Sequence, residues 1–468
     1  MRALPAFIIA LLIAAAAGIL AAHPGTVSLS WEDWHVDSSV GVLVTAVVLL
    51  AMLSAAFFHL LRRILGGPRA YLRGRRERRR RRGYRALTQG MVAVAAGDAE
   101  EAQKFARKAD VLLAEPPLTL LLSAQAAQLN GDEQAARRYF TAMLDRSETE
   151  FLGLRGLVMQ ALRGGDEGAA LALVERAREL RPRTPWVLSS LYELQARAGR
   201  WPEAAATLTE AAKHRALPAE ESRHHRAVLL LEQSRAAAAA GDQRQALLHA
   251  ASAHPLDPGF APATLRYAEL LAAGGNLKKA AKVIEAGWRA APHPDLAAAW
   301  DRLFAADPPM QRLKRAERLI AAIADHPESH LAQARAALSA RLWGEARRHL
   351  EALGGTLDRD QPPSPRVCRG MAELEEAEHG DVTAARSWLA NAATTAALDP
   401  TYVCNACGAE CHVWSALCPV CRSFDSLAWR LPGGSTRRPG ALPVNLMPPL
   451  PVPAPWTAPP PSPAPGRG

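Results

Sequence analysis

The chain has few aromatic residues and lacks the short motifs that usually announce catalysis. Aromatic side chains make up 6% of its 468 residues, and alanine is abundant, which suits closely packed helices better than sheets. The sequence contains no G-x-x-x-x-G-K-[ST], no G-x-G-x-x-G after a strand, no H-E-x-x-H and no G-x-S-x-G. These absences argue against phosphate-loop and dinucleotide enzymes, zinc proteases and serine hydrolases. We therefore expect a protein that is not an enzyme, with no catalytic and no organic-cofactor-binding residues.

The net positive charge is concentrated in one segment. The formal net charge is +10, but residues 62–85 alone hold twelve arginines and a single acid, Glu77. The rest of the chain is therefore close to neutral. A single basic segment on a neutral body does not indicate a nucleic-acid-binding surface.

One pair of residues recurs along the chain. In each copy, an alanine stands five positions after the glycine. The pairs are Gly97-Asp98, Gly131-Asp132, Gly165-Asp166, Gly199-Arg200, Gly241-Asp242, Gly275-Asn276 and Gly380-Asp381, and the alanines are Ala102, Ala136, Ala170, Ala204, Ala246, Ala280 and Ala385. Several steps are 34 residues long, which is the tetratricopeptide period. Glycine ends one helix, Asp or Asn caps the next, and alanine allows close packing. The sequence predicts stacked helical hairpins over residues 85–400.

The register is imperfect in two places. Between Gly199 and Gly241 one unit is lengthened around HRALPAEESRHH, and residues 341–346 (RLWGEA) read as a degenerate unit before an exposed loop at 358–366. Such arrays present a concave groove for a peptide or a protein partner. We expect the tryptophans of the array to pack between hairpins. They are Trp186, Trp201, Trp288, Trp300, Trp343 and Trp388.

Two apolar runs precede the repeats. Residues 4–22 and 39–61 are each long enough to cross a bilayer as a helix. Leu20 occupies the position where signal peptidase requires a small residue, so we expect an uncleaved first span. The arginines of a basic collar, residues 62–84, follow the second span, and basic residues stay in the cytoplasm. Residues 62–468 are therefore predicted to be cytoplasmic, at a bacterial inner membrane, with the collar able to contact anionic lipid.

The segments at the two ends of this arrangement are simpler. Residues 1–61 form the predicted two-span anchor, whose short connection, residues 23–38, is expected to be a hairpin with a strand from Thr26 to Trp31. The last 38 residues, 431–468, hold 13 of the 35 prolines, which predicts an extended, disordered tail. The expected fold class is all-α, with two transmembrane helices, a solenoid and a small metal-binding ribbon.

Five of the six cysteines lie within 404–421, and four of them form two C-x-x-C pairs. The pairs are Cys404 with Cys407 and Cys418 with Cys421, and we predict that residues 401–430 fold around one metal ion. Two such knuckles can aim four thiolates at one centre, and Gly408 permits the first turn. Four thiolates favour tetrahedral Zn²⁺ or an iron of rubredoxin type.

Other roles for these residues were weighed. Cys411 and His412 do not keep the knuckle spacing and are expected outside the ligand set. A redox-active dithiol fits less well than a closed structural site, and haem attachment through C-x-x-C-H lacks its histidine. Cys368 is expected to be a buried small hydrophobe. The doublet His224-His225 is expected to be solvent-exposed, because adjacent residues on a helix point about 100 degrees apart.

Residues 1–400 resemble the HemY family of membrane-anchored tetratricopeptide proteins. The resemblance rests on the two spans, the connection HPGTVSLSWEDWHVDSSVGVL, and the collar running into RRGYRALTQGMVAVAAGDAEEAQKFARKA. It implies a role in haem biosynthesis and partners among tetrapyrrole enzymes. An unrelated flavin-dependent oxidase shares the name, but its dinucleotide fingerprint is missing here.

Residues 402–429 resemble the rubredoxin-like module of the lipopolysaccharide assembly protein LapB, with the four cysteines at the ligand positions. That likeness implies an alternative role as an adaptor between a membrane protease and its client, although LapB carries one span. A haem or porphyrin carrier is a third possibility. In the scaffold interpretation, the metal module is expected to cover the apolar end of the final hairpins.

Overall fold

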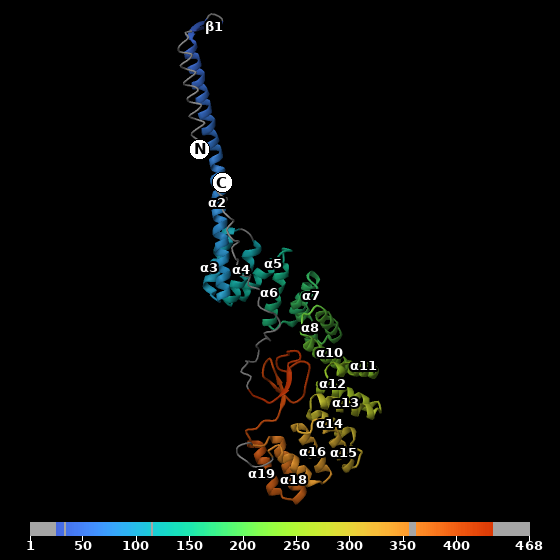
Figure 1. Ribbon diagram of the computed structural model, residues 1–468. Coiled ribbons are helices and arrows are strands. Elements are labelled where there is room, and N and C mark those ends of the chain that lie inside the picture. The colour runs from blue at the N-terminus through green and yellow to red at the C-terminus, as the bar shows by residue number, and fades with distance from the viewer. Residues whose placement is uncertain (1–24, 32–33, 114–115, 355–361, 434–468) are drawn as a thin grey trace, which may run out of the picture. The chain divides into compact units, whose positions relative to one another are not determined.

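The computed structural model describes residues 25–31, 34–113, 116–354 and 362–433 (Figure 1). The predicted first span, residues 4–22, and the predicted tail beyond Gly433 lie outside these residues. Two compact units are present, Met1–Leu122 and Ser123–Gly468, and their boundary falls within helix α4. The helices are α2 (Val40–Ala96), α3 (Ala99–Leu113), α4 (Pro116–Leu129), α5 (Glu133–Met143), α6 (Glu150–Arg163), α7 (Glu167–Leu180), α8 (Pro185–Arg197), α9 (Trp201–Lys213), α10 (Ala219–Ala239), α11 (Gln243–Ala253), the 3₁₀ turn η1 (His254–Leu256), α12 (Ala261–Ala273), α13 (Leu277–Ala290), α14 (Pro294–Leu303), α15 (Pro309–Ile320), α16 (Pro327–Ser339), α17 (Trp343–Glu351), α18 (Pro365–His379) and α19 (Val382–Thr394).

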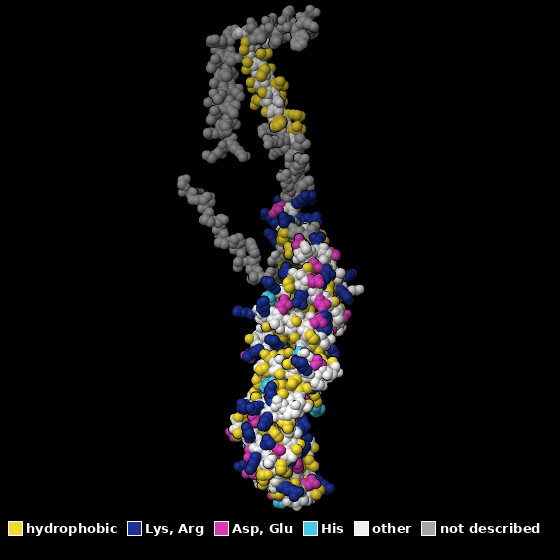
Figure 2. Space-filling model, turned by 90° about the vertical axis from the view of Figure 1, so that its right-hand side faces the viewer, with side chains coloured by type: hydrophobic (Ala, Val, Ile, Leu, Met, Phe, Trp, Pro, Cys, Tyr) yellow, Lys and Arg dark blue, Asp and Glu magenta, His cyan; other side chains and the backbone are white. Residues whose placement is uncertain are grey.

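The first unit begins with the predicted hairpin. Strands β1 (Thr26–Trp31) and β2 (Trp34–Ser39) pair antiparallel, with Thr26 opposite Ser39. Helix α2 follows at once, and its segment Val40–Phe58 is long and apolar enough to cross a membrane, with a mean hydropathy of 2.6. Figure 2 shows the exposed hydrophobic side chains of this segment in yellow. Among the described residues it is the one segment of this kind, so the second of the two predicted spans is supported.

Helix α2 does not stop at the membrane segment. The helix is 57 residues long in all, continues through the collar to Ala96, and is closed by Gly97, whose φ of +75° lies in the left-handed region. Its last part packs against α3, where a Cβ on Gly83 would lie 2.6 Å from Leu113. The apolar segment and the first helix of the array are therefore one continuous helix.

The glycine–aspartate repeats are confirmed in atomic detail. All seven predicted glycines have a φ between +65° and +85°, a range that strains residues with a Cβ. Side chains of Asp132, Asp166, Asp242 and Asn276 each accept a hydrogen bond from the backbone N–H three residues on. Six of the seven predicted alanines are fully buried, and Ala385 is 4% exposed. The helix pairs follow from these local signals.

The two stretches with imperfect register are helical. The degenerate unit keeps the pattern with Arg341 in place of glycine, at a φ of +58°, and with Ala346 fully buried. The lengthened unit becomes the long helix α10. Residues 358–361 of the predicted loop lie outside the described residues, and its last two residues belong to α18, which begins at Pro365. Four of the singled-out tryptophans are buried, and Trp201 and Trp343 are half-buried.

We predict that Gly165→Ala destabilises the array by about 1 kcal/mol, because the new Cβ is held in the left-handed region. Gly165 has a φ of +73° and open space around it, so the loss comes from the backbone alone. Gly168 lies in the first turn of α7, where alanine is the better helix former. Gly168→Ala should leave stability unchanged or raise it, as measured by urea unfolding, and equal losses for the two variants would contradict the prediction.

Candidate metal centre

The structure brings the four predicted cysteines together. All four Sγ atoms lie within 4.8 Å of one another, with Cys404 Sγ 3.7 Å from Cys421 Sγ and Cys407 Sγ 3.8 Å from Cys418 Sγ. A tetrahedral ion with metal–sulfur bonds of about 2.3 Å separates its ligand sulfurs by roughly 3.8 Å. The observed spacing therefore fits a four-coordinate thiolate site for Zn²⁺ or iron.

The two cysteine pairs form matching turns. Gly408 N–H donates to Cys404 O at 2.9 Å, and Arg422 N–H donates to Cys418 O at 2.8 Å. Gly408 and Arg422 both adopt the left-handed conformation, with φ values of +77° and +57°. Each turn therefore points its two thiols in one direction, and the two turns face each other.

Arg422 adopts this conformation at a cost of about 1–2 kcal/mol relative to glycine. Its side chain supplies a compensating contact outside the module. The guanidinium Nη2 donates to Arg197 O at 2.8 Å, and Nε lies 3.7 Å from Glu167 Oε2. Arg422 thus ties the second turn to the helical array.

The thiols lie in a shielded, partly polar environment. Burial raises the pKa of the Cys404 thiol, but its hydrogen bond with the Ser426 hydroxyl and those that it accepts from backbone N–H groups, including that of Ala406, outweigh burial and lower the pKa to about 7. Burial also raises the pKa of Cys407. A positive ion at the centre would favour the thiolate at each sulfur.

The surrounding sheet is small. Strands β3 (Thr401–Cys404), β4 (Glu410–Cys411) and β5 (Leu427–Arg430) form an antiparallel sheet in the order β4-β3-β5. Cys411 lies on β4, where it pairs with Tyr402 of β3, and is not part of the cysteine cluster. Cys368 is fully buried on α18, as predicted.

The four-cysteine module (residues 401–430) does not cover the end of the array. The prediction that it packs on the final hairpins is wrong, because the described core of α15–α19 contains none of its residues. Its core residues, among them Cys404 and Trp414, instead join those of α10 and α12, among them Val228 and Phe260. Figure 1 shows the module on the side of the array opposite to α11, α13 and α15. We call this surface, on α8, α10, and the N-terminal ends of α12 and α14, the docking face.

The histidine doublet belongs to the docking face, so the predicted solvent exposure is wrong. His224 Nε2 and His225 Nε2 lie 3.1 Å and 3.3 Å from the same oxygen, Oδ2 of Asp425 in the module. Asp257 holds the other nitrogen of His224 at 2.7 Å, and the Tyr192 hydroxyl lies 3.2 Å from Nδ1 of His225. Adjacent histidines diverge along a helix, but their long side chains converge on one carboxylate.

The two histidines differ in charge. Burial lowers the pKa of His224, but its hydrogen bonds with Asp257 and Asp425 outweigh burial and raise the pKa to about 10. Burial lowers the pKa of His225. At neutral pH, His224 is therefore a cation between two carboxylates, and His225 is a neutral imidazole beside Asp425.

A second contact lies at the start of the module. The Tyr402 hydroxyl is 3.1 Å from His293 Nε2, and the Trp429 ring is 4.4 Å from that imidazole. His293 is only 4% exposed and caps α14 by accepting from Asp295 N–H. The imidazole of His293 therefore caps α14 and also contacts the module.

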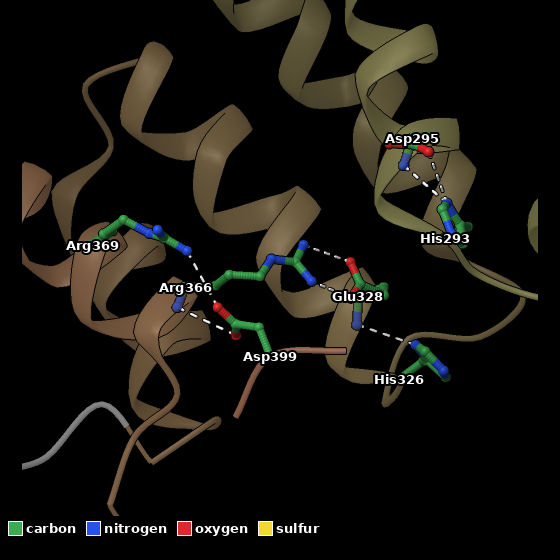
Figure 3. Close-up of polar contacts among 7 residues, drawn as sticks. All are labelled: His293, Asp295, His326, Glu328, Arg366, Arg369 and Asp399. Atoms are coloured by element: carbon green, nitrogen blue, oxygen red, sulfur yellow. Dashed lines mark hydrogen bonds and ion pairs between the residues drawn. The ribbon is translucent and has the colours of Figure 1, made fainter. Parts of the chain in front are cut away.

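The segment before the module is also fixed (Figure 3). Asp399 accepts from the backbone N–H of Arg366 and from Nη2 of Arg369. The Arg366 guanidinium in turn donates both Nη groups to Glu328 of α16. Sequence reasoning missed these residues and Asp425, and the histidine doublet was the one signal that could have indicated docking.

We predict that docking of the module weakens as the pH rises toward 10 and as it falls below 6.5. Asp257 of the array and Asp425 of the module together raise the pKa of His224 to about 10, so the stabilisation that comes from Asp425 is lost as the pH rises toward 10. The lowered pKa of His225 acts oppositely and weakens docking as the pH falls below 6.5. Limited proteolysis of the segment around Asp399, corrected for the protease's own pH dependence, should show cleavage rising with pH above 6.5, by at most about tenfold per pH unit.

Glu193, whose pKa burial raises to about 7, also titrates in this range. The pH profile of Asp425→Asn shows the contribution of Glu193, because this variant keeps Glu193 and loses the carboxylate that faces both histidines. The pH profile of the variant should be shallower than that of the unaltered protein. Equal slopes in the two proteins would show that His224 does not govern docking.

Comparison with known proteins gives a family for the N-terminal region. Residues 25–131 match the family described as HemY protein N-terminus. The chain is similar to the probable magnetosome protein Mms48 of Magnetospirillum gryphiswaldense, with 27% identity over 423 residues, covering 86% of this chain and 88% of that protein. It is also similar to Protein HemY of Escherichia coli K12, with 29% identity over 188 residues, 39% of this chain and 46% of that protein. The second match thus extends over less than half of the E. coli protein.

Two solved structures have some likeness to this chain. One is Naa15/Naa10 bound to HypK-THB, with a TM-score of 0.38 and 15% identity, covering 66% of this chain and 53% of that chain. Another is a tetratricopeptide repeat protein from Parabacteroides merdae, with a TM-score of 0.28 and 14% identity, covering 53% and 93%.

Proposed function

We propose that this chain, a HemY-family protein by its N-terminal region, is a non-enzymatic scaffold that holds protein partners at a bacterial inner membrane. The observation that carries the proposal is the continuity of α2. Its apolar segment Val40–Phe58 and the first helix of the array are parts of one helix, so the array begins at a fixed distance along that helix from the bilayer. Residues 62–468 then lie in the cytoplasm, because the collar arginines follow the apolar segment.

The four-cysteine module has a structural role in this proposal. It holds one Zn²⁺ or iron ion through Cys404, Cys407, Cys418 and Cys421, and the ion keeps a very small sheet folded. Because the module covers the docking face, the partners bind to other surfaces of the array. The module therefore stiffens the middle of the solenoid and restricts where a partner can attach.

The proposed partners are enzymes of tetrapyrrole synthesis, which is the role expected from the HemY resemblance. Crosslinking in native membranes, followed by affinity capture and mass spectrometry, tests this. Tetrapyrrole enzymes should be enriched with the full chain and lost with a chain truncated after Ala96, which keeps the span and collar. A membrane protease with lipid A enzymes in their place would overturn the scaffold for this pathway and favour a LapB-like adaptor. Absorbance in the Soret region on titration with porphyrin would favour a carrier.

A further inference from the structure

The helix pair α14 and α15 departs from the regular pattern of the array. Between α14 and α15 the chain reads Ala305-Ala306-Asp307-Pro308, without the glycine that closes the regular pairs. The two helices make almost no contact with each other, whereas α12 packs on α13 and α16 on α17. The incomplete closure leaves a pocket of about 980 Å³, at the upper end of the size of small-ligand sites.

We name this the cationic pocket. Its lining includes five basic side chains, Lys278, Lys282, Lys314, Arg315 and Arg318, and two acidic ones, Glu285 and Asp307. Both acids are already paired, Asp307 with Arg315 and Glu285 with Arg318 at 3.6 Å. The three lysines have no hydrogen-bond or ion-pair partner among the described residues. The pocket therefore presents unneutralised positive charge.

The lysines are unusual for this chain, which otherwise uses arginine. Its seven lysines are Lys104, Lys108, Lys213, Lys278, Lys279, Lys282 and Lys314, so three of the seven line this one pocket. The N-terminal end of α13, from Gly275 to Leu277, also lines it and adds the partial positive charge of a helix start. Figure 2 shows Lys and Arg side chains, in dark blue, over the C-terminal half of the array.

The cationic pocket also has an aromatic side. Trp300 is 4% exposed, and its ring lies 4.9 Å from that of Phe304. Arg315 stacks over Phe304 at 3.9 Å. The buried Nε1 of Trp300 has no hydrogen-bond partner. The lining thus offers apolar contact beside cations that can bind carboxylates.

We propose that the cationic pocket binds an acidic segment of a protein partner, with carboxylates on the lysines and an apolar side chain against Trp300 and Phe304. This inference rests on the proposed scaffold function and specifies one of its binding sites. Charge complementarity selects the occupant. The chain's own tail, residues 434–468, contains arginines and no Asp or Glu, and the collar is strongly basic, so neither complements the pocket.

The test uses the full-length protein in nanodiscs of neutral phosphatidylcholine and a fluorescein-labelled peptide of glutamates flanking a leucine. Fluorescence anisotropy should show binding that weakens with added salt. Lys282→Glu/Lys314→Glu should lower the affinity by about tenfold or more, because two attractive contacts become repulsive. Both lysines are exposed, so the substitutions should leave the fold intact, as checked by circular dichroism.

Lys108→Glu/Lys213→Glu is the matched control, with the same charge change at exposed lysines outside the pocket. Equal affinity of the two double variants would overturn the proposal. So would equal binding of the peptide with glutamine in place of glutamate, or with serine in place of leucine. Displacement of the peptide by phosphatidylglycerol vesicles, lost in Lys282→Glu/Lys314→Glu, would assign the pocket to lipid instead. If the pathway partners are captured equally by this variant and by the unaltered chain, the scaffold stands and the pocket proposal fails.

Discussion

Cys404→Ser is expected to abolish metal binding and unfold the four-cysteine module. The module has three strands of four, two and four residues, too little structure for independent stability without a metal. Structural zinc contributes roughly 10–16 kcal/mol in small zinc-binding peptides, far more than such a sheet can replace. Elemental analysis of the purified protein should find one ion per chain before the substitution and none after it. Hydrogen exchange of β3 should become fast in the variant.

Cys411→Ser is the control, because Cys411 lies in the same module and outside the cysteine cluster. It should keep both the ion and the protection of β3. The array should stay helical in Cys404→Ser, since its turns and caps are local. Loss of the module would expose Phe260 and Val228 of the docking face, so binding of a hydrophobic dye should rise. Retention of metal by Cys404→Ser would show that the thiolates do not form the site.

Asp425→Asn is expected to release the module from the docking face without unfolding it. Asp425 has a φ of +48°, and asparagine tolerates this conformation well, so the substitution changes charge and not backbone strain. His224 would lose a charge-assisted hydrogen bond, and His225 a close electrostatic contact, to a side chain that is only 5% exposed. A loss of about 2–4 kcal/mol of docking free energy follows.

The measurement is limited proteolysis of the segment around Asp399, which should be cut faster in Asp425→Asn, together with metal content, which should not change. Glu410→Gln makes the same charge change at an exposed residue of the module and should leave proteolysis as it was. Loss of metal in Asp425→Asn would show that docking and metal binding are inseparable. Unchanged proteolysis would show that the histidine contact does not hold the module.

The features that sequence predicts well here are local ones. Each repeat turn contains a glycine in the left-handed conformation, an Asp side chain that accepts a hydrogen bond from the backbone N–H three residues on, and a buried alanine. All of these lie within about six residues of one another. Arg341 shows that the pattern survives loss of the glycine itself, because Trp343 and Ala346 keep their spacing. The cysteine spacing is similarly informative, since each knuckle closes through a hydrogen bond between residues four apart.

The position of the module could not be read in this way. Tyr402 meets His293 across 109 positions, and Arg422 reaches the carbonyl of Arg197 across 225. Such contacts depend on how much each helix pair is rotated relative to the one before it. Small differences in loop and helix length change each rotation, and these changes accumulate along the solenoid. The doublet His224-His225 was visible in the sequence, but nothing near it showed that Asp425 would lie opposite.

By itself, then, the sequence determined the helical repeats, the apolar segment before the arginine collar and the four thiols that lie together. These depend on periodicity, hydropathy and short-range geometry, which a linear sequence carries directly. Only the tertiary structure decided that the module lies against the middle of the array, and that the poorly closed pair α14 and α15 leaves a lysine-lined pocket. The first result arises from contacts between residues far apart in the chain, and the second from the way in which consecutive helices pack, and many small steric and electrostatic terms decide both.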